Sequence, residues 1–167
     1  MYNNDAKHIG YFIKGRITEE IFERMIREDQ NHTFTVIPFG YEKTTPELAQ
    51  YGELIRNYET LTVIRQSPDF ILIKNDKTEV HFVEVKYRKE LNEKVVITLK
   101  ESAENVSRFW FGTWFFVATQ KGFYFDSCNE IIKNGEIRPL GETIISKEIQ
   151  DKYLGVLREF IRIETKK

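Results

Sequence analysis

The spacing of apolar residues predicts one helix near each end of the chain. Apolar side chains recur every three or four positions, which is the period of a helix with one buried face. The first such stripe consists of Ile17, Ile21, Phe22, Met25 and Ile26. The second lies within residues 146–163 and consists of Ile149, Tyr153, Val156, Leu157 and Phe160. Thr18 is the predicted N-terminal cap of the first helix, because a threonine side chain can accept from the first free N–H groups.

Between these helices, the pattern predicts short strands and shorter helices. Residues 33–39 have a strand-like composition, with Pro38 near the end where proline is tolerated. Thr45 followed by Pro46 predicts the start of a second helix that runs to about Asn57. Its predicted buried side consists of Leu48, Tyr51 and Ile55. Residues 61–65 are predicted to form a short β-type segment.

The second half of the chain predicts a helix followed by a hairpin. Residues 95–99 fit a strand and a helix equally well, and residues 100–110 favour a helix. Two aromatic runs, 114–119 and 123–125, flank a turn that contains Gly122. Aromatic side chains can stack on nucleic-acid bases. Because these aromatics lie in continuous runs, we interpret them as the core of a sheet.

A hairpin is also predicted at the centre of the chain. The strand-like runs 70–73 and 80–87 are separated by residues 75–78, which have the residue types that turns need. If those four residues form the loop, Lys74 pairs with Glu79. The same register then continues back along both strands. A slip of one residue would turn every side chain to the other face.

In this register, three charged side chains share one face of the hairpin. Asp69 lies opposite Glu84, and directly opposite residues have Cβ atoms about 5 Å apart. Lys86 is two residues past Glu84 and therefore points to the same side. A solvated hairpin with cross-strand charge pairs is the simpler interpretation. However, these charges interrupt a strongly apolar run, residues 83–87.

Two carboxylates at this separation repel each other unless a cation lies between them. Mg²⁺ takes one or two carboxylates and completes its octahedron with water and phosphate oxygens. A lysine beside such an ion can orient or activate a water molecule. Together, these groups indicate the hydrolysis of phosphodiester bonds.

Pro68-Asp69 followed by Glu84-Val85-Lys86 at the end of the next strand resembles the PD-(D/E)xK nuclease superfamily. The resemblance covers about the first two thirds of the chain, with a core at about residues 15–126. It implies an α/β fold with a central mixed β-sheet flanked by helices, the restriction-endonuclease-like αβββαβ core. It also implies that Asp69, Glu84 and the carbonyl of Val85 bind Mg²⁺ or Mn²⁺, and that Lys86 positions or deprotonates the attacking water.

The first helix offers a fourth member of this site. Glu19 and Glu20 are expected in its first turn, where the helix dipole favours anions. Many members of the superfamily carry a metal-site glutamate on a first helix, a few residues after a glycine, and Gly15 followed by Glu19 fits that pattern. We favour Glu19 because it borders the apolar stripe. The implied catalytic residues are therefore Lys86, Asp69, Glu84 and Glu19.

The composition indicates one ordinary globular domain, and its net charge counts against nucleic-acid binding. The chain has 167 residues, which indicates a single domain. Its net charge is −1, which counts against nucleic-acid binding, although basic residues gather after residue 86 and near the C-terminus. The single cysteine excludes an internal disulfide. With no secretion signal and no membrane span expected, we predict a cytoplasmic protein.

These observations lead to two expectations about function. The first is a Mg²⁺- or Mn²⁺-dependent nuclease that acts on duplex or branched DNA, similar to Holliday-junction resolvases or restriction endonucleases. A resolvase is expected to be a homodimer, because two symmetric cuts need two sites related by a two-fold axis. The alternative is a non-catalytic nucleic-acid-binding or interaction module that retains the nuclease fold. Some superfamily members place a glutamine or tyrosine on the next helix, and residues 100–110 show no equivalent.

Overall fold

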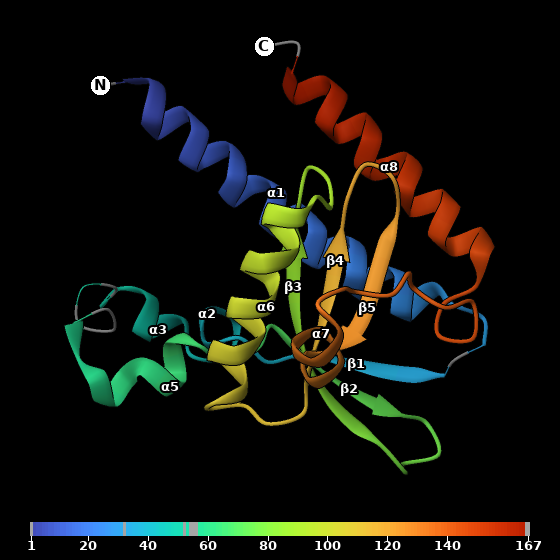
Figure 1. Cartoon of the computed structure of the whole chain (residues 1–167), viewed down its shortest axis with the longest axis horizontal. Helices are drawn as coiled ribbons and strands as arrows, with labels where there is room; N and C mark the ends of the chain where they lie inside the picture. The colour runs from blue at the N-terminus through green and yellow to red at the C-terminus, as the bar shows by residue number, and fades with distance from the viewer. Residues whose placement is uncertain (1, 32, 52, 54–56, 166–167) are drawn as a thin grey trace.

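A five-stranded mixed β-sheet forms the centre of the α/β fold (Figure 1). The computed structural model describes the whole chain except residues 1, 32, 52, 54–56 and 166–167. The strands are β1 (Phe34–Pro38), β2 (Phe70–Lys74), β3 (Val80–Tyr87), β4 (Thr113–Ala118) and β5 (Phe123–Ser127). They lie side by side in the order β1-β2-β3-β4-β5. Only β3 and β4 are parallel, and the other neighbours are antiparallel.

Helices cover both faces of the sheet. A parallel pair needs a long crossover, and helix α6 (Glu93–Ser107) provides it between β3 and β4. Within the described residues, the other helices are α1 (Tyr2–Glu28), α2 (Tyr41–Thr44), α3 (Pro46–Ala49), α5 (Thr62–Arg65), α7 (Cys128–Asn134) and α8 (Lys147–Thr165), with a short 3₁₀ helix at Glu59–Leu61. Figure 1 shows α6 and α7 in front of the sheet, α1 behind it, and α2, α3 and α5 together at one side.

The sheet separates two hydrophobic cores. Phe22 of α1 packs against Phe70 and Phe116 on one face, together with buried residues of α8. Phe115 packs with residues of α6 and α7 on the other face. Neighbouring residues of a strand point to opposite faces. Because Val83 and Val85 of β3 belong to the α1 core, Glu84 and Lys86 point to the α6 face.

The central hairpin has the predicted register. Phe70 pairs with Val83, and the N–H of Lys74 donates to the carbonyl of Glu79 at 3.0 Å. The turn is held by Asp76, whose carboxylate accepts from the N–H of Thr78 at 3.0 Å. This register places Asp69 opposite Glu84. The second hairpin, β4 and β5, is likewise confirmed.

Helix α1 is longer than predicted, because it begins at Tyr2. Thr18 is therefore not a cap. It is fully buried inside the helix, and its hydroxyl donates to the carbonyl of Lys14 at 2.7 Å. Glu19 and Glu20 consequently lie in the middle of α1 and not in its first turn. The predicted apolar stripe is still confirmed, with Ile21 and Met25 buried.

The segment between β1 and β2 differs most from the prediction. The helix that starts at Pro46 ends at Ala49, and Tyr51 is 55% exposed and not on a buried side. Residues 52 and 54–56 of the predicted helix lie outside the described part of the chain. Residues 59–65, predicted in part as a strand, form a 3₁₀ helix and α5. Among the residues that the structure describes, no strand pairs with this segment. Instead, the carbonyl of Val63 accepts from the indole N–H of Trp110 at 3.1 Å.

The remaining helices agree with the pattern in most respects. Residues 95–99, which fitted a strand and a helix equally well, are helical within α6, which Asn92 caps by accepting from the N–H of Val95. In α8, Val156 is 48% exposed, whereas Leu154 and Ile161 are buried. The buried stripe of α8 is thus rotated slightly from the predicted one. Within the described residues, no helix combines the length and apolar character needed to cross a membrane.

Candidate functional site

The candidate site lies where β3 extends beyond its neighbour β2. The ladder between them ends at Phe70 and Val83, and β3 continues to Tyr87. Asp69 takes the place of the next ladder partner, because its Oδ2 accepts from the N–H of Val85 at 2.7 Å. The N–H and C=O of a strand residue point to the same edge. The carbonyl of Val85 therefore faces the same opening as the Asp69 carboxylate.

Glu84 and Lys86 lie next to this opening on the α6 face of β3. The Lys86 ammonium donates to Glu84 Oε1 at 3.0 Å, and its Nζ lies 5.0 Å from the ring centroid of Phe115. The two side chains are 24% and 17% exposed, respectively. A carboxylate and an ammonium are therefore held together at a recessed position that solvent still reaches.

Helix α1 adds Glu19 to the same pocket. Its Oε2 lies 3.1 Å from Lys43 Nζ of α2 and 3.4 Å from Arg16 Nη1. Glu20 is not part of the pocket and pairs with Arg24 at 2.6 Å on the exposed side of α1. The structure therefore brings Glu19, and not Glu20, towards Asp69.

All four predicted catalytic residues line one pocket of about 500 Å³. Its walls come from α1, α2, the segment before β2, β3, α6 and β4. The lining residues are Phe12, Gly15, Arg16, Glu19, Gly40, Tyr41, Glu42, Lys43, Arg65, Gln66, Ser67, Asp69, Glu84, Lys86, Ser102, Asn105, Val106 and Phe115. Gly40 lies beside Asp69 in this wall, at a distance where an added Cβ would make an ordinary van der Waals contact with Asp69 Cα at 3.6 Å.

The carboxyl group of Asp69 has an unusual protonation equilibrium. Burial raises its pKa most, followed by the negative charges of Glu84 and Glu19. The Val85 N–H and the Lys86 ammonium oppose this effect, and the resulting pKa is about 8. A divalent cation in the pocket would reverse this shift, because it favours the charged form.

The oxygen ligands of the pocket suit a cation that keeps several water molecules in its coordination shell. Among the described residues, no three His, Cys, Asp or Glu side chains are grouped closely enough to hold a metal ion by themselves. Mg²⁺ does not require such a cage, since it is commonly held by one or two carboxylates plus water and phosphate oxygens. Asp69 and Glu84, with the Val85 carbonyl beside them, fit that kind of site.

Several lining residues were not predicted from the sequence. Arg16 and Lys43 pair with Glu19, and Ser102 and Asn105 project from α6. Ser102 and Asn105 are three residues apart and flank the buried residues of α6, which is a signal that the helical period contains. No pattern in the sequence relates Lys43 to Glu19, because their contact depends on the packing of α2 against α1.

Comparisons of the chain with protein-family models, curated proteins and solved structures found no match. The chemistry of this pocket is therefore inferred from its own residues and their geometry.

Proposed function

We propose that this chain is a Mg²⁺- or Mn²⁺-dependent nuclease that hydrolyses DNA phosphodiester bonds, with a PD-(D/E)xK type of site. The observation that carries the proposal is the meeting of Asp69, Glu84, Lys86 and Glu19 in one pocket where the sheet opens. The elements α1, β1, β2, β3, α6 and β4 follow one another as in the αβββαβ core of that superfamily, with α2, α3, a 3₁₀ helix and α5 inserted between β1 and β2.

Asp69 and Glu84 would hold the cation, and the Val85 carbonyl would complete the protein's share of the ligands. Once bound, the cation supplies positive charge to the phosphate oxygens and lowers the pKa of a coordinated water. The hydrogen bond from Val85 fixes one oxygen of Asp69. Glu19 is close enough to influence the Asp69 charge, and it would reach the cation directly or through water.

We assign to Lys86 the role of orienting the attacking water. Its ammonium has three donors, of which Glu84 occupies one at 3.0 Å. Contact with Phe115 restricts its side chain. The other donors can therefore hold a water beside the scissile phosphate, and the ammonium stabilises the negative charge that develops in the transition state.

The first test is cleavage of single-stranded, duplex, flapped and four-way DNA with Mg²⁺ or Mn²⁺. We expect cleavage to be lost in EDTA and to fall about 100-fold or more in Glu84→Gln. Even groups that only orient metal ligands are worth ~10–100-fold. Glu79→Gln is the matched control, because Glu79 is an exposed carboxylate that precedes β3 and does not line the pocket. Full activity in EDTA, or in Glu84→Gln, would refute the mechanism.

A second candidate is a non-catalytic nucleic-acid-binding or interaction module. The ion pairs Lys86–Glu84 and Lys43–Glu19 favour it, because they compensate two of the carboxylates without any cation. Titration calorimetry with Mg²⁺ and Mn²⁺, with and without DNA, separates the two candidates. An absence of metal binding under all these conditions would favour the module.

We also propose a homodimer for the resolvase-like form of this function. Symmetric cuts in a four-way junction need two pockets related by a two-fold axis. Light scattering combined with cleavage of a four-way junction and a linear duplex tests this. A monomer that cuts both substrates equally would argue against a resolvase.

A further inference from the structure

An exposed aromatic side chain lies at the mouth of the pocket. Phe12 of α1 lines the pocket and is 62% exposed. The guanidinium of Arg16, about one helical turn further along, lies 5.4 Å from the centre of the Phe12 ring. Glu19 follows after about another turn and lies deeper, with 16% of its side chain exposed. Helix α1 therefore presents an aromatic ring, a cation and a carboxylate in sequence over about 10 Å.

The proposed catalytic side chains lie deeper in the pocket than Phe12. The side chains of Glu19 and Lys86 are 16% and 17% exposed, and α1, α2 and α6 supply walls around them. A paired duplex keeps its bases stacked inside and presents a broad surface. An unpaired strand can turn its bases outward and insert a single nucleotide. A recessed pocket with an aromatic mouth therefore fits an unpaired strand better.

The balanced charges of the pocket also favour an unpaired strand over a duplex. Four basic lining residues face four acidic ones: Arg16, Lys43, Arg65 and Lys86 against Glu19, Glu42, Asp69 and Glu84. Lys43 pairs with Glu19, Lys86 with Glu84, and Arg16 with both Glu42 and Glu19. Duplex binding depends mainly on the neutralisation of many phosphates by lysine and arginine. In single-strand sites, base–aromatic stacking adds to the attraction between basic residues and the backbone, so a pocket with balanced charge and an exposed ring fits a single strand better.

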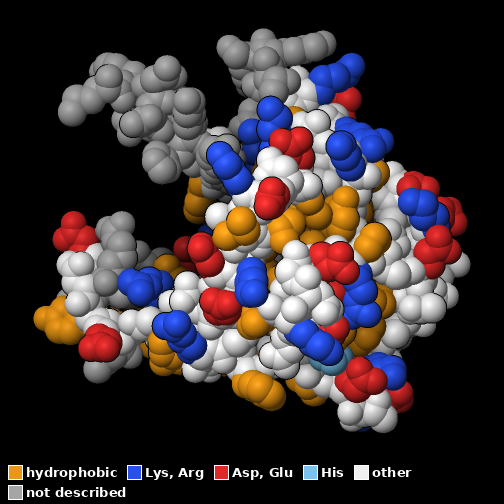
Figure 2. All heavy atoms as spheres, viewed as in Figure 1, with side chains coloured by type: hydrophobic (Ala, Val, Ile, Leu, Met, Phe, Trp, Pro, Cys, Tyr) orange, Lys and Arg blue, Asp and Glu red, His pale blue; other side chains and the backbone are white. Residues whose placement is uncertain are grey.

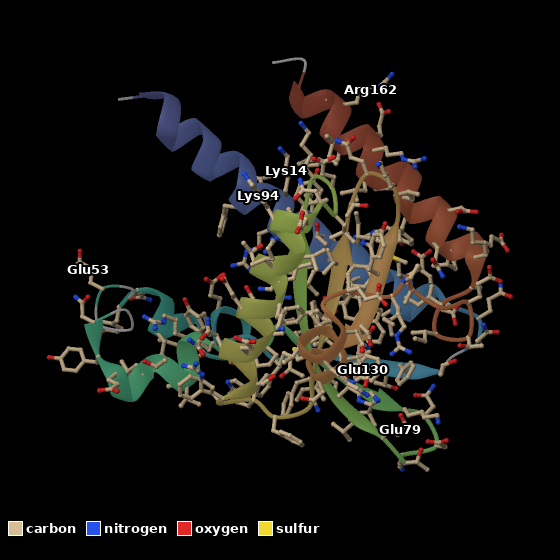
Figure 3. All side chains as sticks on the ribbon, in the orientation of Figure 1. Lys14, Glu53, Glu79, Lys94, Glu130 and Arg162 are labelled. Atoms are coloured by element: carbon tan, nitrogen blue, oxygen red, sulfur yellow. The ribbon has the colours of Figure 1, made fainter. Side chains whose placement is uncertain are left out.

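The surface visible in Figure 2 has no broad basic face either. Basic and acidic side chains are interspersed over it, around an apolar patch. Figure 3 shows Lys14 and Lys94 near the end of the molecule where the termini lie, and Glu79 and Glu130 towards the opposite end. A duplex lying across this face would meet both signs of charge.

We propose that the pocket takes an unpaired nucleic-acid strand, with one base stacked on Phe12 and a neighbouring phosphate placed at Asp69 and Glu84. This inference rests on the proposed nuclease function and names its substrate class. Arg16 supports the stack from the protein side, and the recessed carboxylates receive the backbone. DNA and RNA share the chemistry that the pocket recognises, and the experiment distinguishes them.

Binding is measured first, by fluorescence anisotropy with a labelled single-stranded oligodeoxynucleotide, its RNA counterpart and the corresponding duplex, in EDTA and in Mg²⁺. We expect at least one single strand to bind about tenfold more tightly than the duplex. Phe12→Ala should raise its Kd about tenfold, the size of one base–aromatic stack, and Phe12→Trp should restore the affinity. Phe111→Ala is the matched control, since Phe111 is 81% exposed and does not line the pocket.

Cleavage is then followed on a duplex with an unpaired tail. Cuts confined to the tail, and slowed by Phe12→Ala at low substrate concentration, would support the proposal. Equal binding of duplex and single strands, or an unchanged Kd in Phe12→Ala, would overturn it. If no substrate is cut in Mg²⁺ or Mn²⁺, the nuclease function fails. The anisotropy series still decides whether the pocket holds an unpaired strand.

Discussion

Asp69→Asn is expected to raise the melting temperature of the metal-free protein by about 5–10 °C near pH 8, and to change it little near pH 4. The pKa of Asp69 is about 8 in the folded protein, against 3.8 for an ordinary aspartate, because of burial and of the charges on Glu84 and Glu19. One pKa unit corresponds to ~1.4 kcal/mol, so the difference between pKa values of about 8 and 3.8 sets an upper limit of about 6 kcal/mol. Relaxation of the pocket around the charged carboxylate lowers this cost, which leaves an effect on the order of a few kcal/mol. For a chain of this size, each kcal/mol shifts the melting temperature by ~2–4 °C.

The sign follows from where the proton is bound. Between pH 3.8 and about 8, the folded protein keeps the Asp69 proton and the unfolded chain loses it. The folded state therefore binds more protons, and the free energy of unfolding falls as the pH rises through this window. Asparagine stays neutral throughout, and its carbonyl oxygen can still accept from the N–H of Val85. The free energy of unfolding of Asp69→Asn therefore does not fall with pH for this reason.

Divalent cations should stabilise the wild type much more than the Asp69→Asn variant. A ligand that binds only the folded state stabilises it by ~2.7 kcal/mol at a concentration of 100 times its Kd. Mg²⁺ or Mn²⁺ is expected to raise the melting temperature of the wild type at pH about 8 and to have little effect on Asp69→Asn. Differential scanning calorimetry measures both effects.

The control for this experiment is Asp151→Asn, because Asp151 lies on α8, pairs with Lys147 on the surface and does not line the pocket. It should keep the wild-type response to pH and to the cations. A melting temperature of metal-free Asp69→Asn below that of the wild type near pH 8 would contradict the assigned charge repulsion. An equal response of both proteins to Mg²⁺ would contradict the proposed ligand role of Asp69.

The positions of Asp69, Glu84 and Glu19 could be predicted from the sequence, because they depend on the geometry of one hairpin and one helix. The turn at residues 75–78 and the alternation of apolar residues together define the hairpin register, and this register places Asp69 opposite Glu84. The choice of Glu19 over Glu20 also follows from local geometry, since the helical period determines which of two neighbours borders the buried stripe. The parallel pairing of β3 and β4 agrees with a helix between them.

The rest of the site depends on contacts between distant segments. The pairing of Lys43 with Glu19 requires α2 to lie against α1, and no period in the sequence encodes that. Residues 61–65 contain β-branched residues and are predicted as a short β-type segment, but they fold as the end of a 3₁₀ helix and α5, beside Trp110. The place of Phe12 in the pocket lining could not be predicted from the sequence, because the predicted apolar stripe of this helix begins only at Ile17.

Lys86→Met is expected to lower kcat by about 10²–10⁴-fold, the range of a positioned proton-transfer group. Methionine keeps an unbranched apolar chain for contact with Phe115 and loses only the ammonium. The measurement is single-turnover cleavage of the best substrate with saturating Mg²⁺. Lys89→Met is the control, because Lys89 is exposed just beyond β3 and does not line the pocket.

The same variant separates two roles of the ammonium. If Lys86 orients the attacking water, kcat falls while the affinity for the cation, measured by calorimetry, stays within a few-fold of the wild type. If Lys86 only binds a substrate phosphate, KM rises and kcat is unchanged. Loss of the ammonium also removes a charge that lowers the pKa of Asp69, so metal-free Lys86→Met should melt at a lower temperature than the wild type near pH 8. A wild-type kcat in Lys86→Met would show that Lys86 takes no part in the chemical step.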